Sequence, residues 1–385
     1  MTVSNPAILE EIDPRKLPEI LRTSGPCITM VLPPYHPGES AKPVAALLKI
    51  GVRQAADQLS RLHYPARDTE KLLEPLERLA NDPASLAGSH GARAIFRSNE
   101  VWGQLPLTQP AEMSLTVAGC FAIRPLLTEF WAPKLFYILA VSKDSVALFK
   151  GENEKIEAVP LPAGVPKTLA DALELEPPDH DLENRSSIGS STGSMHAVRF
   201  GTGSGRETAH AHLGDFYKLI DRGIHRLLGE SGVPVLLAGV EQETMAFRAV
   251  SAYPHLVRET LAGSPALSVQ DRQLMSQARA VVCADIQRRE TTALLEALER
   301  STPGRVLSGP EAILQAAFEG RVHKLYVEEQ AARTELVQKP AYRSWGPEDL
   351  LNVATVQTIL HGGSAMQLPR GSMPGHSGAA AILRY

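Results

Sequence analysis

The protein has 385 residues, of which 43% are hydrophobic and 21% are charged, a composition typical of a globular protein with two or three domains. Its formal net charge of −4 excludes a uniformly basic nucleic-acid-binding surface, so any contact with RNA has to be local. Cys27, Cys120 and Cys283 stand far apart without a zinc-binding spacing, which favours buried, reduced thiols. We find no apolar run of membrane-spanning length and no signal-peptide pattern, and we therefore expect a cytoplasmic protein without membrane contacts.

The first block of the chain predicts an α/β domain over residues 1–128. The apolar run 27–32 is expected to form a buried strand that is ended by the two prolines after it. Pro43 opens a long predicted helix, and the turn at 63–65 leads to a second helix near 67–81, so that the two form a hairpin. Further strands are expected at 92–96, 101–105 and 115–118.

The second block, residues 129–285, predicts a central domain. It begins with three short strands in an antiparallel meander, expected at 135–142, 146–150 and 156–161. A connection rich in Pro, Gly and Ser follows from about 162 to 206, and so long a connection inside a domain is usually functional or disordered. Beyond it we expect a helix near 213–229, a buried strand at 233–240 and further helices to about 298.

The third block, residues 286–385, predicts a C-terminal domain in which strands and helices alternate. The expected strands lie at 305–307, 322–328, 364–368 and 379–383. The expected helices lie at 310–319 and 348–360. This alternation indicates an αβα sandwich, and the whole chain is therefore predicted to have a mixed α/β fold in three domains.

A glycine loop beside a basic helix edge is the most informative feature of the chain. Glycine at alternate positions, in the predicted loop 199–214, lets the backbone approach a ligand such as a phosphate. Lys218, Arg222 and Arg226 repeat every four residues and define one edge of the helix that follows. The pattern suits an extended polyanion, while a mobile surface loop and a solvated helix face are the alternatives. The residues expected to contact RNA or the ribosome are Arg199, Gly201, Gly203, Gly205, Arg206, Lys218, Arg222 and Arg226.

Two histidines in the same loop, His210 and His212, are candidates for chemistry together with Arg206. On an extended chain residues i and i+2 point the same way, so the imidazoles could chelate a metal or act as general bases. A third ligand and an orienting partner are not evident in the sequence, and we expect neither a metal nor a cofactor. The simpler interpretation is that both histidines contact RNA phosphate or solvent.

The order of these motifs resembles the archaeo-eukaryotic class 1 release factor and Pelota group, and in particular its bacterial relatives. The first block resembles the release-factor N-terminal domain in SGPCITMVLPP and the helical hairpin after it. The second resembles the central domain in FYILAVSKDSVALFKGENEKIEAV and VPVLLAGVEQETMAFRAV, with the glycine loop and basic helix between them. The third resembles the C-terminal domain in GPEAILQAAFEGRVHKLYVEE. The bacterial branch is resembled in YPHL at 253–256, HGG at 361–363 and the terminal AAAILRY.

This resemblance implies an RNase-H-like central domain and a tRNA-shaped protein able to enter the ribosomal A site. Its implied partners are rRNA, tRNA and a translation GTPase. Release factors carry Gly-Gly-Gln in the central loop, whereas this chain has GTGSGRETAHAH at 201–212. At the hairpin tip, where release factors hold Asn-Ile-Lys-Ser, it has HYPAR at 63–67. Stop-codon decoding and glutamine-dependent peptide release are therefore not expected.

Three hypotheses follow from the sequence. The first is a ribosome-associated translation factor of bacterial type that acts in rescue, hibernation or stress, by binding rather than as an enzyme. The second is a hydrolase or nuclease that uses Arg206, His210 and His212, although the meander lacks the clustered carboxylates that a two-metal nuclease needs. The third is a regulatory module that binds structured RNA.

Overall fold

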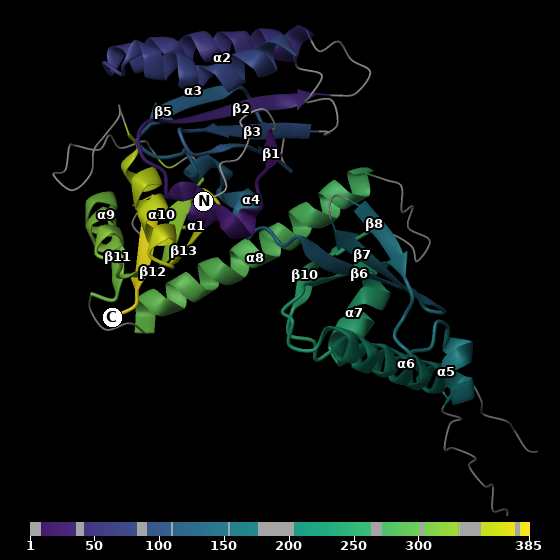
Figure 1. Ribbon diagram of the computed structural model, residues 1–385. Helices are drawn as coiled ribbons and strands as arrows, with labels where there is room; N and C mark the ends of the chain where they lie inside the picture. Colours follow the sequence, from purple (N-terminus) through teal and green to yellow (C-terminus); the bar gives the residue numbers. More distant parts are fainter. Residues whose placement is uncertain are drawn as a thin grey trace, which may run out of the picture. The chain divides into compact units, whose positions relative to one another are not determined.

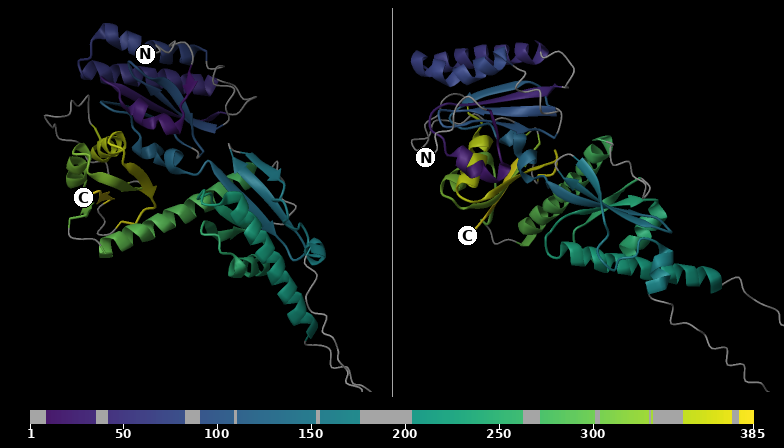
Figure 2. Two further views of the ribbon diagram at one scale, coloured as in Figure 1. Left: turned by 60° about the horizontal axis from the view of Figure 1, so that its bottom comes forward. Right: turned by 45° about the vertical axis from the view of Figure 1, so that its right-hand side comes forward.

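The computed structural model describes residues 9–35, 42–82, 91–108, 111–152, 155–175, 204–262, 272–300, 304–329, 331, 348–373 and 378–385. The chain divides into two compact units (Figures 1 and 2). Residues 1–132 and 287–385 belong to what we call the terminal unit, and residues 133–286 to the central unit. The described residues form three sheets flanked by helices, one within each predicted domain, so the predicted mixed α/β fold is confirmed. The borders of the three domains stay predictions.

The first sheet of the terminal unit has the strand order β1-β4-β3-β2-β5. Its strands are β1 (Glu10–Glu11), β2 (Cys27–Tyr35), β3 (Gly91–Arg97), β4 (Trp102–Pro106) and β5 (Ser114–Ala118). Strand β2 pairs antiparallel with both β3 and β5, so it lies inside the sheet. Alternate residues of β2 enter two different cores: Ile28 and Met30 face one, and Cys27 and Val31 face the other. This explains why its sequence from Cys27 to Leu32 is apolar apart from the buried Thr29.

Two helices, α2 (Lys42–Arg61) and α3 (Ala66–Asn81), form the predicted hairpin and cover one face of this sheet (Figure 1). Their apolar stripes bury Leu48, Leu59 and Leu76 completely in the core that contains Ile28 and Met30. The 3.6-residue period of these apolar positions is why the hairpin could be predicted from the sequence.

A proline inside α3 requires an unusual partner from the sheet. Pro75 has no N–H group, so the carbonyl of Lys71 loses its helical hydrogen bond. The buried guanidinium of Arg97, on β3, supplies the replacement: Nη2 donates to the Lys71 carbonyl at 3.1 Å and Nε donates to the Leu72 carbonyl at 2.9 Å. Burial lowers the pKa of Arg97, and the Glu74 carboxylate opposes that shift.

The third sheet, also in the terminal unit, has the order β11-β14-β12-β13. Its strands are β11 (Val306–Ser308), β12 (Val322–Glu328), β13 (Ser364–Leu368) and β14 (Ala379–Leu383). Helices α9 (Pro310–Phe318) and α10 (Leu350–Leu360) pack on the face that carries Leu325 and Val327. On β12, Lys324 and Tyr326 alternate with these residues and contact Glu290 of α8 (Arg272–Arg300), at 2.6 Å and 2.9 Å.

One hydrophobic core joins the first and third sheets. The same cluster of buried side chains contains Phe96 and Phe121 from the N-terminal part and Leu325, Val353 and Ala381 from the C-terminal part. The helical elements of the N-terminal part that contribute are α1 (Leu17–Leu21), η3 (Arg124–Leu126) and α4 (Leu127–Trp131). The two parts therefore fold against each other as one body.

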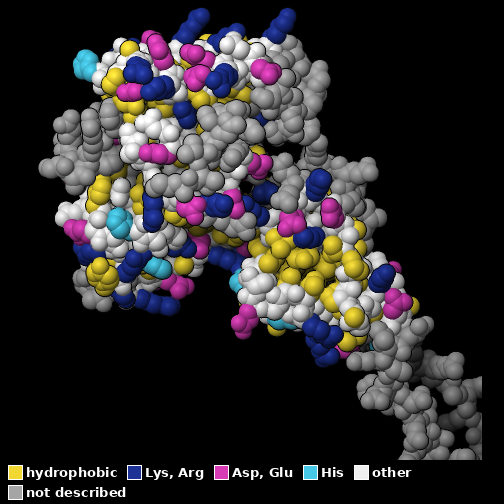
Figure 3. Space-filling model, viewed as in Figure 1, with side chains coloured by type: hydrophobic (Ala, Val, Ile, Leu, Met, Phe, Trp, Pro, Cys, Tyr) yellow, Lys and Arg dark blue, Asp and Glu magenta, His cyan; other side chains and the backbone are white. Residues whose placement is uncertain are grey.

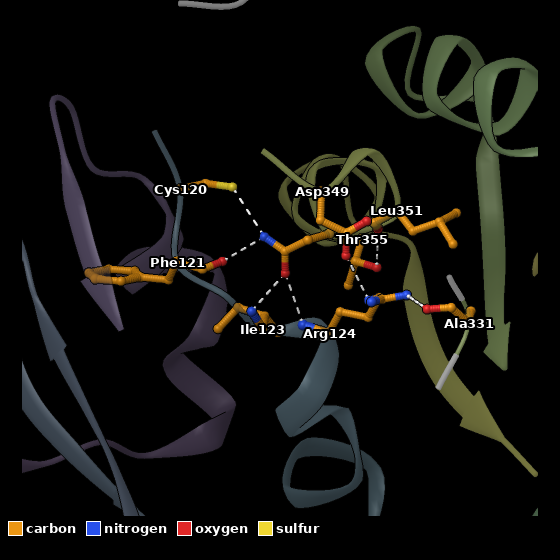
Figure 4. Close-up of polar contacts among 9 residues, drawn as sticks. Cys120, Phe121, Ile123, Arg124, Ala331, Asp349, Leu351 and Thr355 are labelled. Carbon is orange, nitrogen blue, oxygen red and sulfur yellow. Dashed lines mark hydrogen bonds and ion pairs between the residues drawn. The ribbon is translucent and has the colours of Figure 1, made fainter. Parts of the chain in front are cut away.

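A buried amide, Asn352 of α10, holds this junction together (Figure 4). Its Oδ1 accepts hydrogen bonds from the backbone N–H groups of Ile123 at 2.8 Å and Arg124 at 2.9 Å. Its Nδ2 donates to the Phe121 carbonyl at 2.9 Å and to Cys120 Sγ at 3.4 Å. An ion pair of 2.8 Å between Arg124 and Asp349 lies beside it, and every polar atom of the amide is satisfied.

The central unit is built on a sheet of order β10-β9-β6-β7-β8. Its strands are β6 (Leu135–Val141), β7 (Val146–Glu152), β8 (Lys155–Val159), β9 (Val235–Gly239) and β10 (Leu256–Leu261). Strands β6, β9 and β10 are parallel, while β6, β7 and β8 form the predicted antiparallel meander. Helices α5 (Leu169–Leu175), α6 (Ser204–Leu228) and α7 (Glu241–Val250) contribute to the core on one face, and α8 packs on the other.

Replacing Arg97 by Met should lower the free energy of unfolding by about 2 kcal/mol, because the Lys71 carbonyl then remains buried without a donor. Urea unfolding measures this. Pro75→Ala restores the helical N–H, so Arg97→Met should cost less in that background. Equal costs in both backgrounds would contradict the assignment of the guanidinium to the gap left by Pro75.

Replacing Asn352 by Leu should lower the free energy of unfolding of the terminal unit by about 3 kcal/mol, since several buried backbone groups lose their partner at once. Gln315→Leu, on the exposed side of α9, is the control and should cost under about 0.5 kcal/mol. Hydrogen exchange should show that Asn352→Leu loosens both the N-terminal and the C-terminal sheet. Loosening confined to the C-terminal sheet would contradict the single-body interpretation.

Candidate nucleic-acid interface

The helix that follows the glycine segment begins earlier than the sequence predicts. We expected a loop to about Gly214, but α6 begins at Ser204. Between Gly205 and Gly214 there is no Gly or Pro, and Ala, Arg, Glu and Leu favour helix, so the helix extends back over this stretch. Gly214 itself lies within the helix, where one glycine costs only about 1 kcal/mol.

The early start of α6 changes the setting of the candidate residues. Arg199, Gly201 and Gly203 lie outside the described residues. Gly205, Arg206 and His210 belong to the helical backbone, and their side chains lie outside the description. His212 is half-buried on the same helix.

The extended arrangement expected for His210 and His212 is wrong. In a helix, residues two apart are about 200° apart around the axis rather than on one side. Among the described residues there is no group of three or more His, Cys, Asp or Glu side chains that could hold a metal ion.

Helix α6 is fixed firmly against the central sheet. Phe216, Tyr217 and Ile220 are buried against Leu139 and Leu237 of strands β6 and β9. The Tyr217 hydroxyl donates to a Glu243 carboxylate oxygen at 2.8 Å. Burial raises the pKa of Tyr217, and the Glu243 carboxylate raises it further, so the phenol stays protonated as a donor. The opposite side of the helix is consequently presented on a rigid support.

The basic edge, which we define as Lys218, Arg222 and Arg226, lies on that opposite side, and all three side chains are exposed. Lys218 pairs with Asp215 at 3.0 Å, and Arg226 donates to the Ala163 carbonyl at 3.3 Å. Arg222 makes no hydrogen bond or ion pair within the described part of the chain. In the space-filling view, Lys and Arg side chains gather near one end of α6 (Figure 3). The contacts of Lys218 and Arg226 therefore hold their side chains in place, and the positive charge of the edge is only partly neutralised.

A buried carboxylate beside the basic edge was not singled out from the sequence. Asp221 of α6 accepts hydrogen bonds from the Ser251 hydroxyl at 2.5 Å and from the Ala252 N–H at 3.1 Å. His225, one turn further along α6, places Nδ1 3.5 Å from the same carboxylate and packs edge-on against Tyr253. The four-residue spacing of Asp221 and His225 was a usable signal, but nothing in the sequence places Ser251 next to them.

The helical hairpin of the terminal unit offers a second basic surface. Lys49, Arg53, Arg61 and Arg67 are exposed on α2 and α3 and have no hydrogen bond or ion pair to described residues. At the tip, His63 adopts a φ of +54°, in the left-handed position that glycine usually takes at the end of a helix. This conformation puts the exposed His63 at the apex of the turn.

Two of the three cysteines are buried, as the sequence predicts. Cys27 and Cys120 are buried thiols outside any disulfide, and burial raises the pKa of Cys27, which keeps it protonated. Cys283 is half-buried. Within the described residues, the helices include none that is both long and apolar enough to cross a membrane.

Comparison with known proteins agrees with the predicted resemblance. The model of bacterial archaeo-eukaryotic release factor family 3 matches residues 135–321. No curated protein matches the chain. The matched segment, just under half of the chain, is similar to this bacterial branch of the archaeo-eukaryotic release factors.

Solved structures give distant matches over most of the chain. The archaeal translation termination factor aRF1 is 15% identical with a TM-score of 0.25, over 97% of this chain and 99% of that one. Archaeal Pelota, in a model of the ribosome-bound protein with ABCE1, is 11% identical with a TM-score of 0.36, over 100% and 98%. Pelota of Archaeoglobus fulgidus is 11% identical with a TM-score of 0.34, over 76% and 79%.

Proposed function

We propose that this protein is a translation factor that binds the ribosomal A site through the basic edge and acts in rescue, hibernation or stress. The observation that carries the proposal is a cationic edge, held on a rigid helix, inside the segment that matches the release-factor family. Ribosomal RNA presents phosphates to such an edge, and phosphate contacts supply affinity without base-specific recognition. A translation GTPase as a further partner stays a prediction from the resemblance.

Two features of the sequence support binding without peptide release. The chain contains no Gly-Gly-Gln, and the hairpin tip at 63–67 differs from the codon-reading motif of release factors. Peptide release needs a group that stabilises the forming oxyanion in a fixed geometry. Residues 204–212 are helical, so this stretch does not present an extended loop to a substrate. This also weakens the alternative of a hydrolase or nuclease based on Arg206, His210 and His212.

The hairpin supports a second candidate contact. Two of its exposed cations, Arg61 and Arg67, flank the strained tip at His63, and strained backbone often marks functional positions. A structured-RNA-binding role would use this surface instead of, or in addition to, the basic edge.

The purified protein should co-sediment with vacant bacterial ribosomes, and the bound fraction should fall as salt rises, because cations that contact phosphates release counterions. Sucrose-cushion pelleting at several salt concentrations measures this. A folded sample that stays in the supernatant even at low salt would refute the proposed function.

Replacing Lys218, Arg222 and Arg226 together by Glu should weaken ribosome binding by at least about tenfold, because each loses a phosphate contact and adds repulsion. Replacement by Gln should give a smaller loss and a shallower salt dependence, by about one unit of slope for each lost contact. The melting temperature should change little, because exposed charges contribute little to folding.

The matched control for that experiment replaces Lys49, Arg53 and Arg61 of the hairpin by Glu. It carries the same change of charge on another exposed helix. Loss of binding in the control alone would move the RNA contact to the hairpin and contradict the assignment to the basic edge.

On stalled ribosomes the protein should release no peptide from peptidyl-tRNA above background, because the oxyanion-stabilising motif is missing. Release of a labelled nascent peptide measures this, with a release factor as the positive control. Rapid release that disappears on His210→Ala or His212→Ala would show that an imidazole has taken over the role, and would reinstate the hydrolase hypothesis.

A further inference from the structure

Two imidazoles contact one buried tyrosine next to the basic edge. Tyr253 is buried, and its hydroxyl donates to the Val233 carbonyl at 2.7 Å. The His225 ring meets the Tyr253 ring edge-on at a centroid distance of 5.3 Å, and the His255 ring does so at 5.8 Å. Since both imidazoles contact one ring, they form a single local cluster, which we call the imidazole pair.

The buried Asp221 carboxylate fixes the orientation of His225. Both groups near Nδ1 are acceptors, the carboxylate at 3.5 Å and the Asp221 backbone carbonyl at 3.3 Å, so the ring proton resides on Nδ1. The side chain of His225 is 38% exposed, whereas that of Asp221 is 9% exposed. The imidazole therefore reaches solvent while its orienting partner does not. Nε2 of His225 makes no hydrogen bond to a described residue.

The imidazole pair continues the basic edge. Around the axis of α6, His225 lies between the buried Asp221 and the exposed Lys218 and Arg222. On the other side, His255 borders the turn at Gly232, whose φ is +71°. The adjoining segments carry further charged or titratable groups: Asp221, Arg222 and Lys218 on α6, Tyr253 before β10, and the exposed Glu230 in the turn after α6. The carboxylate of Asp221 is already engaged by Ser251 and Ala252.

We propose that His225 and His255, together with Arg222, form a phosphate-binding site for an RNA strand that tightens as pH falls. This inference rests on the proposed RNA-binding function and adds a pH-sensitive contact to it. When neutral, the outward Nε2 of His225 is an acceptor and cannot bind a phosphate oxygen. When protonated, it donates and adds a positive charge beside Arg222. Imidazole is the side chain whose charge changes between about pH 5 and pH 8.

Fluorescence anisotropy with labelled oligouridylate and the full-length protein tests the site, at about pH 6 and about pH 8. The wild type should bind at least about fivefold more tightly at the lower pH, which is a coupling of about 1 kcal/mol. The double variant His225→Gln, His255→Gln should keep the weaker affinity at both pH values. Its circular dichroism and melting curve establish that it is folded.

The control replaces His323 and His361, two exposed histidines of the terminal unit, by Gln, and should keep the full pH dependence. Asp221→Asn tests the positioning role of the carboxylate: the pH dependence should shrink while the affinity at about pH 8 stays near that of the wild type. An unchanged pH profile in the His225→Gln, His255→Gln variant would overturn the proposal. So would loss of the pH dependence in the His323/His361 control.

Ribosome pelleting of the same variants at about pH 8 separates this inference from the proposed function. If wild type and double variant both pellet with ribosomes but share one pH profile on oligouridylate, the imidazole site is refuted and the proposed function stands. If neither pellets but the pH dependence on oligouridylate follows His225 and His255, the A-site proposal fails and the imidazole site stands.

Discussion

One buried amide connects parts of the chain that are more than two hundred residues apart. Asn352 binds the backbone of residues 121–124, so the segment that closes the first sheet is hydrogen-bonded to a helix of the third. A shared hydrophobic core surrounds this contact. The central unit, which leaves after Ala132 and returns before Gln287, is in consequence an insertion between two halves of one folded body. Both of its ends are attached to a support that cannot come apart without exposing that core.

Most secondary structure could be predicted from the sequence because local patterns determine it. The hairpin α2–α3 follows from its apolar period, and the meander β6–β8 follows from short apolar runs with tight turns. The core shared by the first and third blocks could not be predicted, because nothing local to Asn352 reveals a partner at Cys120–Arg124. In the sequence, the only sign of this long-range packing is a polar residue within an apolar helix.

The candidate nucleic-acid interface likewise has one feature that the sequence predicts and others that it does not. The four-residue repeat of the basic edge is a local property of a helix, and its exposure agrees with the pattern. The start of the helix was predicted wrongly because alternating glycines suggested a loop up to Gly214, while the residues from Arg206 onwards favour helix. The imidazole pair was missed because His225 and His255 come together only through the crossover that returns the chain from β9 to β10.

Asp221 couples this local fold to the surface chemistry beside it. Its carboxylate accepts hydrogen bonds from Ser251 and Ala252, which fixes the end of α7 against α6. The oxygen that accepts from Ala252, Oδ2, also faces the imidazole of His225. A buried carboxylate is costly unless its hydrogen bonds are satisfied, and here the hydroxyl and the backbone N–H satisfy it whether or not His225 is charged. The hydrogen bonds from Ser251 and Ala252 to Asp221 can therefore persist while the imidazole of His225 gains or loses a proton. A change in surface charge then requires no change in the packing of the helix, which keeps the basic edge in place at either protonation state.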